Sequence, residues 1–150
     1  GLLQFFGLLG QRIKVSHPNE LSSQEVSQYK SAKLIAEACM YISQNCSDPL
    51  TLESVSHTIG ISKSYFAHLF KDYTKMTFID FLTAERIKKS EGLFINSGQK
   101  IIDIAFECGF TSISSFNRAF KKIKGLSPTE FRKISIAGTY PIQKYPVSDT

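Results

Sequence analysis

The 150-residue sequence lacks the motifs of the common cofactor and nucleotide sites. It contains no G-x-x-x-x-G-K-[ST], G-x-G-x-x-G or H-E-x-x-H segment, the patterns that bind phosphates, dinucleotides and catalytic zinc. Its three histidines have no metal-ligand spacing with its cysteines. Nothing in the chain order brings Ser, His and Asp side chains together as a nucleophilic site. We therefore expect no enzymatic activity, no metal and no cofactor.

Cysteine is scarce as well. There are three cysteines, at Cys39, Cys46 and Cys108, and no C-x-x-C pair. An odd number without paired spacing argues against a disulfide framework. The pattern indicates a reducing, cytoplasmic setting, and we expect Cys39 and Cys108 to be buried structural thiols.

Apolar runs long enough for a membrane span are also absent. Residues 1–15 are the most apolar segment, but a span needs about 20 apolar residues. Arg12 and Lys14 follow the apolar run, whereas a signal peptide has its basic residues before it. We predict no membrane segment. Since it would otherwise expose a large apolar surface, we expect residues 1–15 to pack on the chain or on a second copy.

What the sequence does contain is helical periodicity, clearest over residues 101–133. Ile101, Ile104 and Ala105 fall on one helical face before Gly109, a residue type that ends helices in the left-handed conformation. After the turn, a second apolar face consists of Phe116, Ala119, Phe120 and Ile123. The opposite face carries Ser114, Asn117, Arg118 and Lys121. Two short helices across a glycine turn predict a helix-turn-helix, whose second helix enters the major groove.

The same pattern occurs earlier in the chain. Leu52, Val55 and Gly60 match Ile101, Ile104 and Gly109 at an offset of 49, and Phe66, Phe70 and Lys71 match Phe116, Phe120 and Lys121 at an offset of 50. A repeat of this period is typical of stacked structural units. The fold class we predict is all-α, with two helix-turn-helix subdomains joined by a linker helix.

Helix boundaries follow from capping patterns. Ser22 and Glu25 form a capping box, which predicts a helix from Ser23 to about Asn45. Its expected buried residues are Leu34, Ile35, Ala38, Met40, Tyr41 and Ile42. Thr51, Ser62 and Ser127 are expected to cap later helices. The linker helix, residues 77–95, would span about 28 Å, and two recognition helices on successive major-groove segments lie roughly 34 Å apart.

The segment GFTSISSFNRAFKKIKGLSPTEFRK, residues 109–133, resembles the signature of the AraC/XylS transcriptional regulators. The resemblance extends over roughly residues 31–134. The chain departs from the family at Ser56 and Ser90, where alanine is usual, and at Lys75, where glycine is usual. The resemblance implies a bacterial, homeodomain-like DNA-binding domain that regulates transcription, with RNA polymerase as a further candidate partner.

The domain organisation follows from the repeat and the resemblance together. Residues 1–22 are expected to be an apolar helix and linker, the end of an upstream sensor or dimerisation domain through which a homodimer would form. Residues 23–134 would be the double helix-turn-helix domain, and residues 135–150 a flexible tail.

Charge supports a nucleic-acid partner. The 18 Lys and Arg exceed the 13 Asp and Glu by 5, and residues 97–133, with seven basic and three acidic side chains, hold +4 of that excess. A basic patch implies an anionic partner, although lysines also occur simply as a solvated helix face. The alternative is a helical protein-interaction module without specific DNA binding, which predicts no steep salt dependence.

The candidate site residues are the outward residues of the two second helices, residues 63–71 and 113–123. Base-reading candidates are Ser64, Ala67, His68, Ser114, Asn117 and Arg118. Phosphate candidates are Lys63, Lys71, Lys121, Lys122 and Arg132. Arg118 ranks first, since arginine pairs bidentately with guanine.

Overall fold

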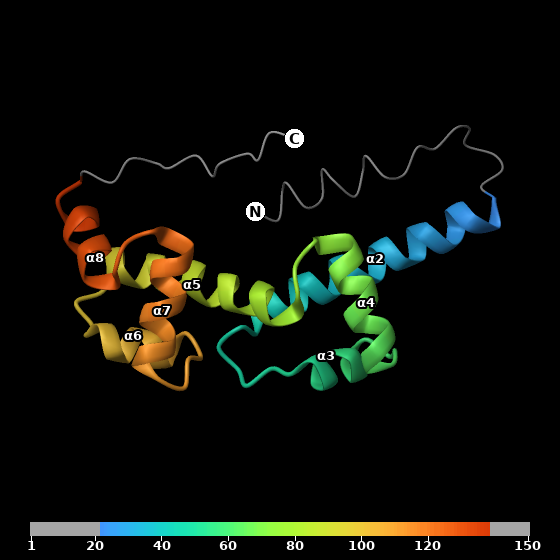
Figure 1. Cartoon of the computed structure of the whole chain (residues 1–150), viewed down its shortest axis with the longest axis horizontal. Helices are drawn as coiled ribbons and strands as arrows, with labels where there is room; N and C mark the ends of the chain where they lie inside the picture. The colour runs from blue at the N-terminus through green and yellow to red at the C-terminus, as the bar shows by residue number, and fades with distance from the viewer. Residues whose placement is uncertain (1–21, 139–150) are drawn as a thin grey trace. The chain divides into compact units, whose positions relative to one another are not determined.

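The computed structural model describes residues 22–138, which form seven helices and no strand (Figure 1). In chain order the helices are α2 (Ser23–Gln44), α3 (Leu52–Thr58), α4 (Lys63–Thr74), α5 (Phe78–Asn96), α6 (Ile101–Glu107), α7 (Ile113–Lys124) and α8 (Pro128–Ile136). The all-α prediction is confirmed. None of these helices is long and apolar enough to cross a membrane. The N-terminal segment up to residue 21 and the tail from residue 139 lie outside the described residues.

The helices form two compact units, one ending at Glu85 and the other beginning at Arg86, so the boundary falls within α5. In each unit a short helix, a glycine turn and a longer helix follow one another. Gly60 ends α3 with φ +76°, and Gly109 ends the turn after α6 with φ +92°. The matching pairs predicted from the sequence therefore build the same local backbone twice.

Phenylalanine dominates the core of the first unit. Phe66 and Phe70 of α4 are fully buried and contact each other edge to face, with 5.3 Å between their ring centroids. Both also contact Phe78 at the start of α5. Ile35 and Val55 bring α2 and α3 into the same cluster, so α4 is fixed against all three neighbouring helices.

The second unit repeats this arrangement with other partners. Phe116 and Phe120 of α7 are fully buried and pack against Phe94 of α5. Phe131 of α8 contacts both Phe94 and Phe120. The fully buried Ile104 joins α6 to the cluster. Helix α7 therefore packs against α5, α6 and α8.

The predicted helix starts are confirmed. Ser22, Thr51, Ser62 and Ser127 each accept a hydrogen bond from a backbone N–H in the first turn of the following helix. Ser112 caps α7 in the same way. Each such cap contributes about 1 kcal/mol.

Some predictions of burial and length were wrong. Met40 is 47% exposed, because two residues from Ala38 and Ile42 turn a side chain to the opposite side of a 3.6-residue helix. Ile123 is 42% exposed, since Lys124 occupies the inward position next to it. Helix α4 continues to Thr74, beyond the end at residue 71 expected from the pattern, and α8 extends to Ile136, two residues into the segment expected to be the tail.

The departures from the family pattern at Ser56 and Ser90 have a simple structural solution. Both side chains are buried. The Ser56 hydroxyl donates to the carbonyl of Glu53 at 2.9 Å, and the Ser90 hydroxyl donates to the carbonyl of Ile87 at 2.6 Å. A buried hydroxyl with a hydrogen-bond partner avoids the desolvation penalty of an unpaired one. The cores therefore tolerate serine at both positions.

The third departure from the family pattern, Lys75, has an unfavourable backbone conformation. It ends α4 in the left-handed conformation, with φ +60°, and is the only non-glycine residue with positive φ in the described part of the chain. Gly125 ends α7 at the equivalent position of the repeat with φ +75°. A left-handed conformation costs a residue with a Cβ about 1–2 kcal/mol.

The substitution Lys75→Gly should therefore raise the free energy of unfolding by about 0.5–1 kcal/mol, the relief of strain being partly offset by the freedom glycine gains in the unfolded chain. Gly125→Ala is the matched control: a Cβ there would meet no heavy atom within 4 Å, so a loss of about 1 kcal/mol would report backbone strain alone. Urea denaturation followed by circular dichroism measures both. A destabilised Lys75→Gly variant would contradict this account of the cap.

Candidate nucleic-acid interface

Helix α7 presents a polar and basic face opposite the side that holds it in the core. Ser114, Asn117, Arg118, Lys121 and Lys122 are all exposed, while Phe116 and Phe120 between them are fully buried. No ion pair within residues 22–138 engages the three cations of this face. They are therefore available for an anionic partner.

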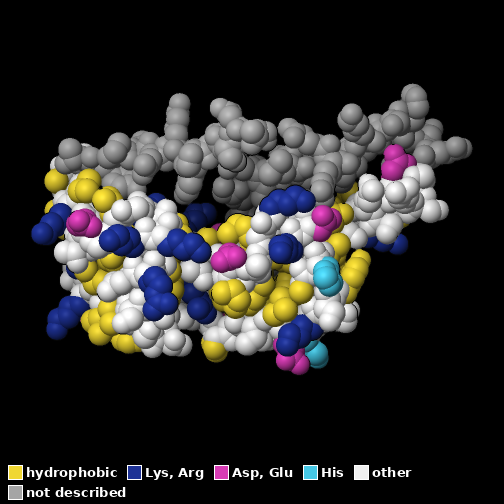
Figure 2. All heavy atoms as spheres, viewed as in Figure 1, with side chains coloured by type: hydrophobic (Ala, Val, Ile, Leu, Met, Phe, Trp, Pro, Cys, Tyr) yellow, Lys and Arg dark blue, Asp and Glu magenta, His cyan; other side chains and the backbone are white. Residues whose placement is uncertain are grey.

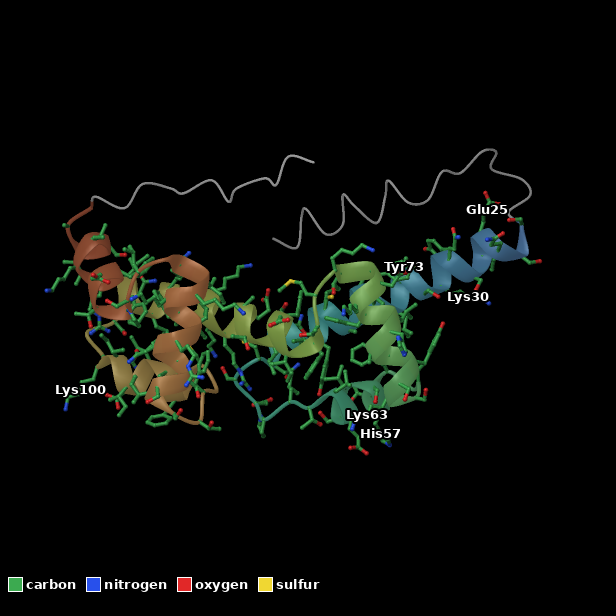
Figure 3. All side chains as sticks on the ribbon, viewed as in Figure 1. Glu25, Lys30, His57, Lys63, Tyr73 and Lys100 are labelled. Carbon is green, nitrogen blue, oxygen red and sulfur yellow. The ribbon has the colours of Figure 1, made fainter. Side chains whose placement is uncertain are left out.

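Helix α4 presents an equivalent face of different chemistry. Lys63, Ser64, His68 and Lys71 are exposed, and Ala67 is half-buried. Lys63, at the start of the helix, lies beside α3 (Figure 3), with its Nζ 3.8 Å from the Glu53 carboxylate. The structure thus places all the predicted residues of this helix at the surface, but with fewer free cations than α7.

The offset of 50 places the candidates of the two helices at matching positions. Ser64 corresponds to Ser114, Ala67 to Asn117, His68 to Arg118 and Lys71 to Lys121. Since Ser62 and Ser112 cap both helices and both have 12 residues, equivalent positions face equivalent directions within each unit. The structure brings each set together on one helix face.

Tyr65 was missed in the sequence analysis. It is 51% exposed and lies on the same strip of α4 as His68 and Asp72, at i, i+3 and i+7. The aromatic character of Tyr65 suggests a core residue, but its position beside the inward Phe66 already indicated an outward side chain.

Arg132 is used within its own unit. One guanidinium N–H donates to the Gln99 carbonyl at 2.6 Å, and the guanidinium carbon lies 5.0 Å from the Phe94 ring centroid. The side chain is half-buried. These contacts tie α8 to the loop between α5 and α6, so Arg132 is a weak candidate for a phosphate contact.

An ion pair fixes the C-terminal end of α7. Lys124 Nζ lies 2.9 Å from the Glu91 carboxylate of α5, with side-chain exposures of 11% and 25%, and 5.7 Å from the Phe131 ring centroid. Removing one partner of a desolvated pair leaves the other charge uncompensated. Lys124 therefore fixes the position of α7 against α5, whereas Lys121 and Lys122 remain exposed.

We expect Glu91→Gln to lower the free energy of unfolding by about 1–2 kcal/mol, less than for a fully buried pair because both groups keep some solvent. The exposed pair Lys33–Glu37, at 4.0 Å with exposures of 65% and 57%, provides the control: Glu37→Gln should change stability by less than about 0.5 kcal/mol. Urea denaturation compares the two, and equal effects would show that the Glu91–Lys124 pair adds nothing through its burial.

The thiols offer no reactive group. Cys39, Cys46 and Cys108 are all buried. Burial, and to a smaller extent the nearby Glu85 carboxylate, raise the pKa of Cys39 to about 12, so its nucleophilic thiolate is not populated at neutral pH. Between residues 22 and 138, no group of three or more His, Cys, Asp or Glu side chains could hold a metal ion.

The comparisons with known proteins agree with this geometry. A family model described as a helix-turn-helix domain matches residues 55–134. The melibiose operon regulatory protein of Escherichia coli K12 is 28% identical over 135 residues, which cover 89% of this chain and 44% of that protein. The chain thus spans less than half the length of this curated relative.

Two solved structures have the same fold. The C-terminal domain of AraT, a response regulator from Geobacillus stearothermophilus, matches with a TM-score of 0.64 and 31% identity, covering 77% of this chain and 93% of that one. The DNA-binding domain of AdpA, a global transcriptional factor, in complex with a target DNA matches with a TM-score of 0.66 and 21% identity, covering 69% and 94%. At 21% identity, the likeness to AdpA concerns the fold alone.

Two helix-turn-helix units with exposed second helices define a DNA-binding domain of the double helix-turn-helix class. The matched helix-turn-helix model covers more than half of the chain, and the identity with the AraT domain extends over nearly all of that domain. The chain belongs to the AraC/XylS family of transcriptional regulators.

Proposed function

We propose that this chain binds double-stranded DNA sequence-specifically, by inserting α4 and α7 into adjacent major-groove segments, and that it thereby regulates transcription. The observation that carries this proposal is the matched pair of exposed polar faces on two helices of equal length, each anchored by two buried phenylalanines. A helix fits the major groove, and short polar or cationic side chains on its outer face reach base edges. The AdpA domain, which shares the fold, is in complex with a target DNA.

The proposed roles follow from side-chain chemistry. Arg118 would pair with guanine through two N–H donors, and Asn117 with adenine, while Ser114 accepts or donates to either. Ser64, Ala67 and His68 would face bases in the other groove segment. Lys121 and Lys122 would contact phosphates, which set register and affinity rather than sequence preference. Lys63 and Lys71 are the phosphate candidates of α4 and would contribute less, since Lys63 lies 3.8 Å from the Glu53 carboxylate and Lys71 is followed by Asp72.

The same proposal includes the domain bounds, the cellular location and further partners of the chain. Residues 23–134 would form the DNA-binding domain and act in the cytoplasm without catalysis. An upstream domain, dimerisation through residues 1–22 and a contact with RNA polymerase would complete a regulator of this family. The alternative of a protein-interaction module without specific DNA binding predicts no salt-dependent DNA affinity.

Selection from a pool of random duplexes, repeated across a salt series, tests the proposal. We expect an enriched motif of two blocks about ten base pairs apart, with affinity that falls steeply as salt rises. One enriched block would restrict base recognition to a single unit. No binding at low salt would overturn the proposal and favour the interaction module.

The substitution Arg118→Ala should weaken binding to the selected site by about 1–3 kcal/mol and relax the preference at one base position. The control is Arg118→Lys, which keeps the positive charge but loses the bidentate geometry. Competition assays with selected and random duplexes measure both variants. If Arg118→Lys binds the selected site as tightly as the unmodified chain, then Arg118 is a phosphate contact and not a base-reading residue.

A further inference from the structure

The two helix-turn-helix units have opposite net charge, although one sequence pattern builds both. Residues 22–85 contain five Lys against seven Asp and Glu, a net charge of −2. Residues 86–138 contain ten Lys and Arg against four Asp and Glu, a net charge of +6. On the face shown in Figure 2, Lys and Arg side chains gather around α7, whereas around α3 and α4 they alternate with acidic ones. The two units therefore cannot contribute equally to phosphate binding.

The cations at both ends of α4 already have carboxylate neighbours. Lys63 lies 3.8 Å from Glu53, and Lys75 lies 3.6 Å from Asp72. Both pairs are exposed, so each is weak, but each places a negative charge where a phosphate would approach. Lys71 is the one lysine of α4 and its cap that no ion pair within residues 22–138 engages.

The repeat makes the contrast sharpest near the end of each recognition helix. Lys71 and Asp72 of α4 correspond to Lys121 and Lys122 of α7, and all four residues are exposed. The Glu130 carboxylate interacts electrostatically with Lys121. Its pKa is lowered mainly by hydrogen bonds from the Ser127 hydroxyl and backbone, and less by Lys121 and Lys133. One position thus carries a negative charge in the first unit and a positive charge in the second.

We propose that the second unit supplies nearly all the phosphate contacts that hold the chain on DNA, and that the first unit adds sequence recognition through the neutral side chains of α4. This inference rests on the proposed function. Besides its lysines and Asp72, α4 exposes Ser64, Tyr65 and His68. A unit with net charge −2 gains little from random DNA, so α4 binds only where base contacts offset the repulsion, and this raises discrimination.

Matched substitutions at repeat-equivalent positions of the full chain test the inference. Lys71→Gln and Lys121→Gln each remove one exposed cation. Binding to the selected duplex and to a random duplex is measured across a salt series, at a pH where histidine is neutral. Lys121→Gln should reduce the slope of log Kobs against log salt by about one, and it should lower the affinity for both duplexes by a similar factor. Lys71→Gln should reduce the slope by much less than one, since the first unit contributes few of the phosphate contacts.

A charge exchange provides the second arm. Asp72→Lys gives α4 the same pair of lysines that α7 has. It should steepen the slope by about one, and it should raise the affinity for random DNA more than the affinity for the selected site. His68→Ala should reduce discrimination between the two duplexes and leave the slope unchanged. Since all these side chains are exposed, circular dichroism should show the same helix content in every variant.

The outcomes separate the inference from the proposed function. Equal loss of slope in Lys71→Gln and Lys121→Gln would overturn the inference while leaving DNA binding in place, since both units would then contact phosphates. A wild-type chain without salt-dependent DNA binding would overturn both. A much larger loss of slope in Lys121→Gln than in Lys71→Gln, together with lost discrimination in His68→Ala, would establish the division between the units.

Discussion

Two buried phenylalanines at i and i+4 on the second helix of each helix-turn-helix unit are the constraint on which the remaining structure depends. Phe66 and Phe70 anchor α4, and Phe116 and Phe120 anchor α7, all without exposed surface. Burying one face of a helix fixes its rotation about its own axis, and this rotation decides which side chains face outward. Truncating such a phenylalanine to alanine costs about 3–5 kcal/mol, a large share of the stability of a small domain. The orientation of the exposed polar residues of α4 and α7 is therefore set by core packing, not by the polar residues themselves.

Much of this architecture could be predicted from the sequence because its determinants are local. The serine and threonine caps, the glycines after α3 and α6, and the spacing of the buried phenylalanines each act within a few residues. The same periodicity correctly placed Ser64, His68, Asn117 and Arg118 at the surface. Those assignments required only helical geometry and no knowledge of tertiary contacts.

What the sequence did not reveal depends on contacts between helices. Arg132 and Lys124 look like any other cation in a basic segment, yet Arg132 bonds to Gln99 and Lys124 pairs with Glu91. Ile123 follows the apolar period of α7 but is exposed, because Lys124 takes the inward place. Tyr65 was overlooked for the opposite reason, since its aromatic ring suggests burial. The residue type alone does not show whether such a side chain is exposed or engaged in a contact, whereas its neighbours in the folded structure do.

Helix α5 has a consequence for whether the two units can be separated. Its first turns supply Phe78 and Leu82 to one core, and its later turns supply Ile87 and Phe94 to the other. One uninterrupted helix, α5, is therefore part of both repeats. No loop separates the two units. Dividing the chain within α5 would interrupt the helix on which both cores pack. The two units can thus differ in surface charge, as their net charges of −2 and +6 show, while one continuous helix contributes to both cores.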